Sequence, residues 1–214
     1  MSSLSNSGSR HPARPDAAEA RRPVSELTTQ KAPVASLDTI ETKWIELFDD
    51  LRSDAKIKDQ LAALFLSVPA LDSRSILYVG KATAGPWGKT PSGSNEARIK
   101  QRHEYTKKFL AETAPTYNSG FWQFARELDA EAAKKWKNAN PKPLQHIAWT
   151  NVCKIGALKG NPRGLLFRRQ RELSIETLRQ EITLYKPRLI CFVTWNYEWS
   201  VVKEVFHDAS ELSR

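Results

Sequence analysis

Cysteine is scarce in this chain, whose 214 residues include only Cys153 and Cys191. Both lie inside apolar runs, which is typical of reduced thiols in a core rather than of a disulfide framework. They do not have the spacing of a zinc or iron–sulfur site. The sequence therefore predicts a reducing compartment, no metal and no cofactor.

Long apolar stretches and a surplus of acid are also missing. No run is long enough to span a membrane, and the first residues hold no hydrophobic signal core. Only 24 acidic residues stand against 33 basic ones, which leaves a formal charge of +9. We therefore expect a soluble cytoplasmic protein, with no membrane contact and with a polyanionic partner.

The composition divides the chain in two. Residues 1–35 are rich in Ser, Pro, Ala and Arg and hold few large apolar groups. Such a segment cannot bury enough surface to offset its ordering entropy, so we expect a disordered tail. Residues 36–214 are long enough to form one domain with its own core.

Helical and strand patterns alternate along this second part. Helices are predicted at 37–51, 56–67, 95–112, 119–137 and 165–185, with a last one beginning near Tyr197. Buried strands are predicted at 75–80, from Ile147 to about Asn151, and at 187–194. Glycines and prolines in 81–94 and around Pro162 indicate irregular loops.

Three apolar strands separated by helices predict an α/β fold, a three-layer α/β/α sandwich with a short parallel sheet. Ligands of such sheets bind beyond the carboxyl ends of the strands. The loops that begin at Gly80, Asn151 and Thr194 all lie there. We therefore expect them to form one site.

Asn151 is the most informative of these residues. An amide at the end of a buried strand offers a donor and an acceptor on a rigid support, which suits the edge of a nucleobase. A basic segment without acids follows it, and its charges suit phosphates. The candidate backbone contacts are Lys154, Arg163, Arg168 and Arg169. The alternatives are that Asn151 caps a turn and that the basic segment is a solvated helix face.

Five segments together resemble the uracil-DNA glycosylase superfamily. Gly80–Ala84 stands where the family places a glycine-led motif, commonly Gly-Glu-Ala-Pro-Gly, and Tyr117–Phe121 is similar to its aromatic and Ser-Gly helix start. Thr150–Lys154 matches its Thr-Asn-Val-x-Lys strand end. Gly160–Arg163 occupies the place of its Asn-Arg-x-Pro type loop, and Lys186–Ile190 that of its Lys-Pro-x-Leu-Ile strand. The resemblance spans roughly 75–196.

Two departures from the family pattern concern catalysis. Lys81 replaces the acidic or amide residue after the first glycine, and no His-Pro-Ser type loop follows, since His207 precedes Asp208. The four-cysteine cluster of some branches is absent as well. Either the domain is C-terminally incomplete, or its site is built differently, or it no longer cleaves a bond.

The resemblance implies recognition of a flipped DNA base and hydrolysis of its N-glycosidic bond. It implies base contacts from Gly80, Ala82 and Asn151, with Tyr117 or Phe121 stacked on the base. Lys81 is the candidate catalytic residue, because an ammonium group can stabilise an anionic leaving base or form a covalent adduct at an abasic sugar.

Simpler structural readings remain open. Lys81 could be a solvated loop lysine, and both aromatic residues could belong to the core. The alternative function is a non-catalytic nucleic-acid-binding relative that kept Asn151 and the basic surface.

Overall fold

The computed structural model describes residues 37–72, 75–83, 91–138, 141–194 and 199–206. The predicted tail at 1–35, the loop from 84 to 90, Asn196 and His207 lie outside the described residues.

The helices begin and end close to the predicted positions. They are α1 (Leu37–Ser53), α2 (Asn95–Lys108), α3 (Gly120–Lys135), α4 (Gly164–Tyr185) and α5 (Trp199–Val205). Serines cap two of them, because Ser94 Oγ accepts from Ala97 N at 3.3 Å and Ser119 Oγ accepts from Trp122 N at 3.4 Å. A π-helical turn, η2 (Phe109–Thr113), continues α2.

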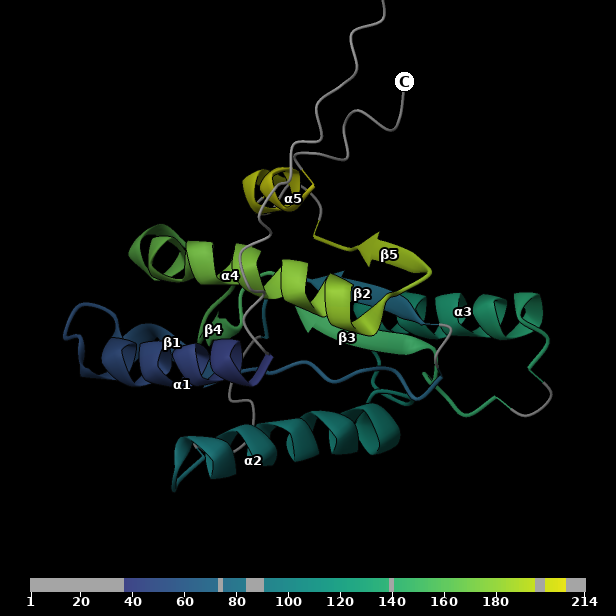
Figure 1. Ribbon diagram of the computed structural model, residues 1–214, viewed down its shortest axis with the longest axis horizontal. Coiled ribbons are helices and arrows are strands. Elements are labelled where there is room, and N and C mark those ends of the chain that lie inside the picture. Colours follow the sequence, from purple (N-terminus) through teal and green to yellow (C-terminus); the bar gives the residue numbers. More distant parts are fainter. Residues whose placement is uncertain (1–36, 73–74, 84–90, 139–140, 195–198, 207–214) are drawn as a thin grey trace, which may run out of the picture. The chain divides into compact units, whose positions relative to one another are not determined.

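A three-stranded parallel sheet confirms the predicted α/β class. β2 (Ile76–Gly80) lies between β3 (Ile147–Asn151) and β5 (Leu189–Phe192), as Figure 1 shows. The β2–β3 pairing runs from Ile76 opposite Ile147 to Gly80 opposite Asn151. The carboxyl ends of β2 and β3 therefore meet at one edge of the sheet.

Alternate residues of β2 face different helices. Tyr78 packs in one apolar cluster with Trp122 and Ala125 of α3. Leu77 packs in another cluster with Leu178 of α4 and Val201 of α5. This alternation gives three layers, with α3 on one face of the sheet and α4 and α5 on the other.

A second, antiparallel pair of strands was not expected. A short 3₁₀ helix, η1 (Lys58–Gln60), leads into β1 (Leu61–Leu64), which pairs with β4 (Ile155–Ala157). The predicted helix at 56–67 is therefore wrong. Almost every residue of 61–68 is buried, so the segment lacks the polar face of a surface helix. The two strands pack with α1 in a core of their own.

β5 is less buried than its neighbours. All five residues of β2 and of β3 are buried, whereas Leu189 of β5 is 48% exposed. Within the described part of the chain, β5 pairs with β2 alone. Its other edge is therefore not paired with a strand of the described residues.

Gly156 of β4 packs against the chain that follows β2. A Cβ at this position would lie 2.1 Å from the backbone oxygen of Thr83, so any side chain must move that backbone. We expect Gly156→Ala to lower the free energy of unfolding by about 1–3 kcal/mol. Gly120→Ala is the matched control, because nothing lies within 4 Å of its Cβ position.

Thermal denaturation of the two variants measures the difference. The control should melt at or slightly above the parent's temperature. Equal melting temperatures for both variants would show that the Thr83 backbone does not lie close enough to Gly156 to exclude a side chain there.

Candidate functional site

The predicted residues Gly80 and Asn151 lie side by side where β2 and β3 end. Backbone hydrogen bonds continue this pairing beyond the strands. Val152 N donates to Gly80 O at 2.9 Å, and Cys153 N donates to Lys81 O at 2.9 Å. The loop that carries Lys81 is thus fixed to the segment that follows Asn151.

Only glycine fits at position 80, because the side chains of Asn151 and Phe121 lie too close to leave room for a Cβ. A Cβ on it would lie 2.3 Å from Asn151 Oδ1 and 3.0 Å from Cε2 of Phe121. Any larger residue would push the amide out of its position. The glycine thereby sets which way the Asn151 side chain faces.

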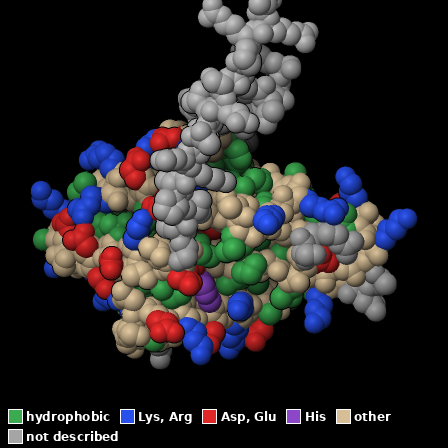
Figure 2. All heavy atoms as spheres, in the orientation of Figure 1, with side chains coloured by type: hydrophobic (Ala, Val, Ile, Leu, Met, Phe, Trp, Pro, Cys, Tyr) green, Lys and Arg blue, Asp and Glu red, His purple; other side chains and the backbone are tan. Residues whose placement is uncertain are grey.

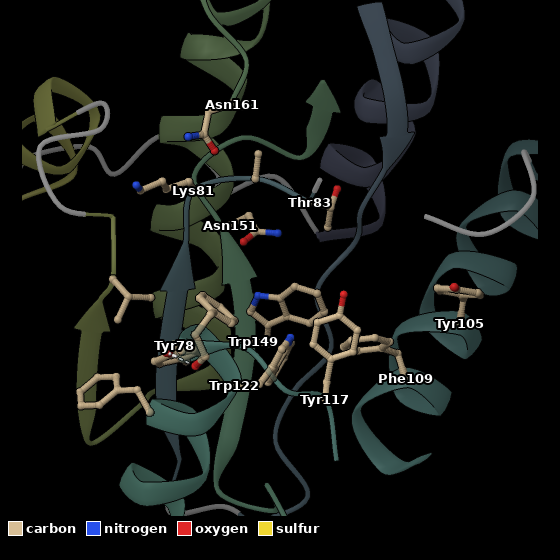
Figure 3. A pocket seen from close by; sticks show the side chains of 15 residues that line it. Tyr78, Lys81, Thr83, Tyr105, Phe109, Tyr117, Trp122, Trp149, Asn151 and Asn161 are labelled. Carbon is tan, nitrogen blue, oxygen red and sulfur yellow. Dashed lines mark hydrogen bonds between the residues drawn. The ribbon is translucent and has the colours of Figure 1, made fainter. Parts of the chain in front are cut away.

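A cavity of about 790 Å³ opens over this edge of the sheet (Figure 3). Its volume lies in the range of small-molecule and cofactor sites. Five predicted residues line it, namely Lys81, Ala82, Tyr117, Phe121 and Asn151. The other described lining residues are Tyr78, Thr83, Tyr105, Phe109, Gly120, Trp122, Phe124, Trp149, Asn161 and Val193.

Packed aromatic rings form one wall of the cavity. The Trp149 ring centroid lies 4.8 Å from that of Trp122 and 4.4 Å from that of Phe65. Tyr78 donates its hydroxyl hydrogen to the backbone oxygen of Phe121 at 2.7 Å. Burial raises the pKa of Tyr78 well above its usual value, so the phenol remains a donor at neutral pH. This hydrogen bond fixes Phe121 beside Gly80.

Two buried polar atoms of the cavity lack hydrogen-bond partners. Asn151 is 1% exposed and Thr83 is 4% exposed. Within the described residues, neither Asn151 Nδ2 nor Thr83 Oγ1 has a partner. An unsatisfied buried polar group costs about 1–3 kcal/mol. Asn151 Nδ2 can therefore donate to an acceptor on a ligand, and the Thr83 hydroxyl can form a second hydrogen bond with the same ligand.

Lys81 supplies the positive charge of the cavity. Among the described lining residues it is the one cation, and none is acidic. In Figure 3 its side chain extends away from the Asn151 amide, on the same side as Asn161. Lys81 is partly buried and lies at the polar end of the cavity, opposite the rings of Tyr117 and Phe109.

Lys154 is not a surface cation, which corrects its predicted contact with a DNA phosphate. It is 1% exposed, and its Nζ lies 2.5 Å from Oε1 of Glu181, which is also 1% exposed. Glu181 accepts further hydrogen bonds from Ser67 at 2.5 Å and from Thr150 at 2.7 Å. Burial of a long charged side chain beside a carboxylate explains the correction, because the ammonium group cannot reach a surface ligand.

The other predicted backbone contacts differ from one another. Arg169 pairs with Asp50 and with Asp54, the latter at 3.7 Å. Arg163 and Arg168 are exposed and have no ion-pair partner in the described part of the chain. Over α1 and the start of α4, acidic and basic side chains are intermingled on the face drawn in Figure 2. The basic segment is therefore neutralised in part by acids from other elements.

Several lining residues were not predicted. Trp149 lies two positions before Asn151 on β3, so strand alternation could have placed it on the same face. Thr83 and Asn161 lie inside two of the segments that carry the family resemblance. Tyr105 and Phe109 come from α2 and η2, and no local pattern indicates that these helical residues reach the sheet.

The described residues contain no group of three or more His, Cys, Asp or Glu side chains placed to hold a metal ion. None of the helices in the described ranges is both long enough and apolar enough to cross a membrane. Comparison with protein-family models, curated proteins and solved structures gives no match for this chain. The family resemblance therefore stays a prediction from motifs.

The buried Lys154–Glu181 pair gives a direct test of the correction. Lys154→Met leaves an uncompensated buried carboxylate and should lower the free energy of unfolding by about 3–5 kcal/mol. The double variant Lys154→Met/Glu181→Gln removes both charges and should recover most of that loss. Urea denaturation measures both. If Lys154→Met keeps its stability but binds DNA more weakly, the correction is wrong and Lys154 contacts a DNA phosphate as the sequence predicted.

Proposed function

We propose that the cavity binds one unpaired nucleobase of DNA, in a domain with a uracil-DNA glycosylase-like fold. The observation that carries the proposal is the pair of unpartnered polar atoms, Asn151 Nδ2 and Thr83 Oγ1, in a cavity walled by aromatic rings. A planar heterocycle with a carbonyl on its edge fits both features. Its edge accepts from the amide, and its face packs on a ring.

The topology supports the proposed fold. A short parallel sheet lies between helices, and the predicted base-reading amide ends a strand beside the glycine-led segment. Phe121, from the start of α3, packs against the same glycine. These are the positions that the family resemblance assigns to base recognition.

The charges of the cavity suit a nucleic acid. Lys81 lines the cavity without an acidic neighbour among the described lining residues, and the whole chain carries +9. Arg163 follows the lining residue Asn161 by two positions and is exposed. Arg163 and Arg168 are the remaining candidates for phosphate contacts.

Excision of the base is a second candidate function, favoured by Lys81. Water would add to the sugar carbon while the base leaves with the bonding electron pair and takes up a proton. An ammonium group near the base would stabilise the negative charge that develops on it. The alternative function, nucleic-acid binding without catalysis, requires only the Asn151 amide, the aromatic rings of the cavity and the positive charge of Lys81.

Asn151→Ala should weaken binding of the target base while the protein stays folded. The variant loses one base-edge hydrogen bond, so affinity for a uracil-containing single strand should fall by about 1–3 kcal/mol. Because Nδ2 has no partner in the described residues, the melting temperature should not fall. Fluorescence anisotropy and thermal denaturation report the two quantities. Asn95→Ala, at the start of α2 and outside the cavity lining, is the control.

A lower melting temperature with unchanged affinity would contradict this role. Asn151 would then be a structural residue that caps the turn after β3, and the base would not lie against it.

Excision is tested with an end-labelled uracil-containing oligonucleotide, followed by alkaline cleavage at abasic sites. If Lys81 stabilises the leaving base, Lys81→Met should slow release by about 10²–10³-fold. Lys81→Arg keeps the positive charge and should retain part of the rate. No release by the parent protein rejects excision and leaves the binding proposal to the Asn151 experiment. Trapping with borohydride would reveal a covalent lysine adduct instead.

A further inference from the structure

Exposed aromatic rings gather at the cavity. Four aromatic residues are prominently exposed in the described part of the chain, namely Tyr105 at 38%, Tyr117 at 51%, Phe124 at 42% and Trp199 at 48%. Three of the four line the cavity. Single exposed apolar side chains need no explanation, but several around one cavity indicate a binding surface.

The three rings come from separate elements. Tyr105 lies on α2, Tyr117 precedes α3, and Phe124 lies on α3. Their meeting therefore does not follow from the apolar stripe of a single helix. Tertiary structure brings them together, which makes the aromatic surface a property of the site.

Two of these rings pack against other aromatic rings. The Tyr117 ring centroid lies 6.2 Å from that of Phe109, and Arg126 Nη1 donates to the backbone oxygen of Tyr117 at 3.2 Å. The Phe124 ring centroid lies 6.2 Å from that of Tyr78. Both rings thus pack on one side while part of their surface stays open to a ligand.

The cavity is divided chemically. Figure 3 shows Asn151, Thr83, Lys81 and Asn161 at one end, and Tyr117, Phe109 and Tyr105 at the other. One base held by Asn151 would occupy only the polar end of a cavity of about 790 Å³. The aromatic end is left for further planar groups.

We propose that the cavity takes single-stranded DNA, whose bases next to the one held by Asn151 stack on Tyr117, Phe124 and Tyr105. This inference rests on the proposed function and specifies its substrate. A single strand offers several open base faces joined by an anionic backbone, and aromatic side chains with nearby cations bind such strands. In a duplex the neighbouring bases are stacked and paired, so their faces cannot meet the protein.

The test compares three probes by fluorescence anisotropy and calorimetry. They are a single-stranded DNA of about ten nucleotides with one uracil, the same strand in a duplex, and deoxyuridine monophosphate. The variants Tyr117→Leu, Phe124→Leu and Tyr105→Leu keep an apolar side chain but remove the ring. Trp199→Leu is the matched control, because Trp199 is equally exposed but does not line the cavity.

The parent should bind the single strand more tightly than the duplex. Tyr117→Leu and Phe124→Leu should each weaken strand binding by roughly 5- to 150-fold, the effect of one lost base stack. In Phe124→Leu, binding of the mononucleotide should change by less than about twofold, and Trp199→Leu should behave as the parent.

Two results would overturn the inference. One is equal affinity for the duplex and the single strand, and the other is unchanged strand binding in all three ring variants. In either case, mononucleotide binding that depends on Asn151 would leave the proposed function intact. If the mononucleotide does not bind and Asn151→Ala changes nothing, the proposed function itself has failed, and this inference with it.

Discussion

The buried contact between Lys154 and Glu181 joins the parts of the protein that hold the site. Lys154 follows β3, Glu181 belongs to α4, and Ser67, just beyond β1, donates to the same carboxylate. Removing two charges from water is costly, and such a pair is tolerated only when hydrogen bonds complete it. Thr150 supplies a further bond, and it directly precedes Asn151. The position of the amide in the cavity thus depends on a polar network behind it.

The cavity combines two kinds of unfavourable feature. Among the described residues, two buried polar atoms that line it, Asn151 Nδ2 and Thr83 Oγ1, lack partners, and three of its rings keep part of their surface in water. Each feature lowers the stability of the free protein. Natural proteins retain such local conflicts mainly where function requires them. This concentration of unfavourable features is the strongest argument that the cavity binds a ligand.

The sequence predicted the parallel sheet and the meeting of Gly80 with Asn151, because both follow from short-range patterns and from the rule that ligands lie beyond strand ends. It did not predict β1 and β4, whose uniformly apolar residues fit a buried strand or a buried helix equally well. Lys154 was misplaced because local sequence does not reveal a carboxylate 27 positions away. Tyr105 was missed for the same reason, since only tertiary packing brings α2 to the cavity.

The order of the strands also affects how the chain reaches this structure. β2 is the middle strand, yet its partners come much later, since Ile76 pairs with Ile147 on one side and with Leu189 on the other. Closing such long loops costs entropy before any strand contact repays it, so sheets of this kind form slowly. During synthesis the apolar β2 leaves the ribosome long before either neighbour exists. Of the helices made meanwhile, α3 is the one whose residues Trp122 and Ala125 pack in one cluster with Tyr78 of β2, so α3 can cover this face of the strand before the sheet closes.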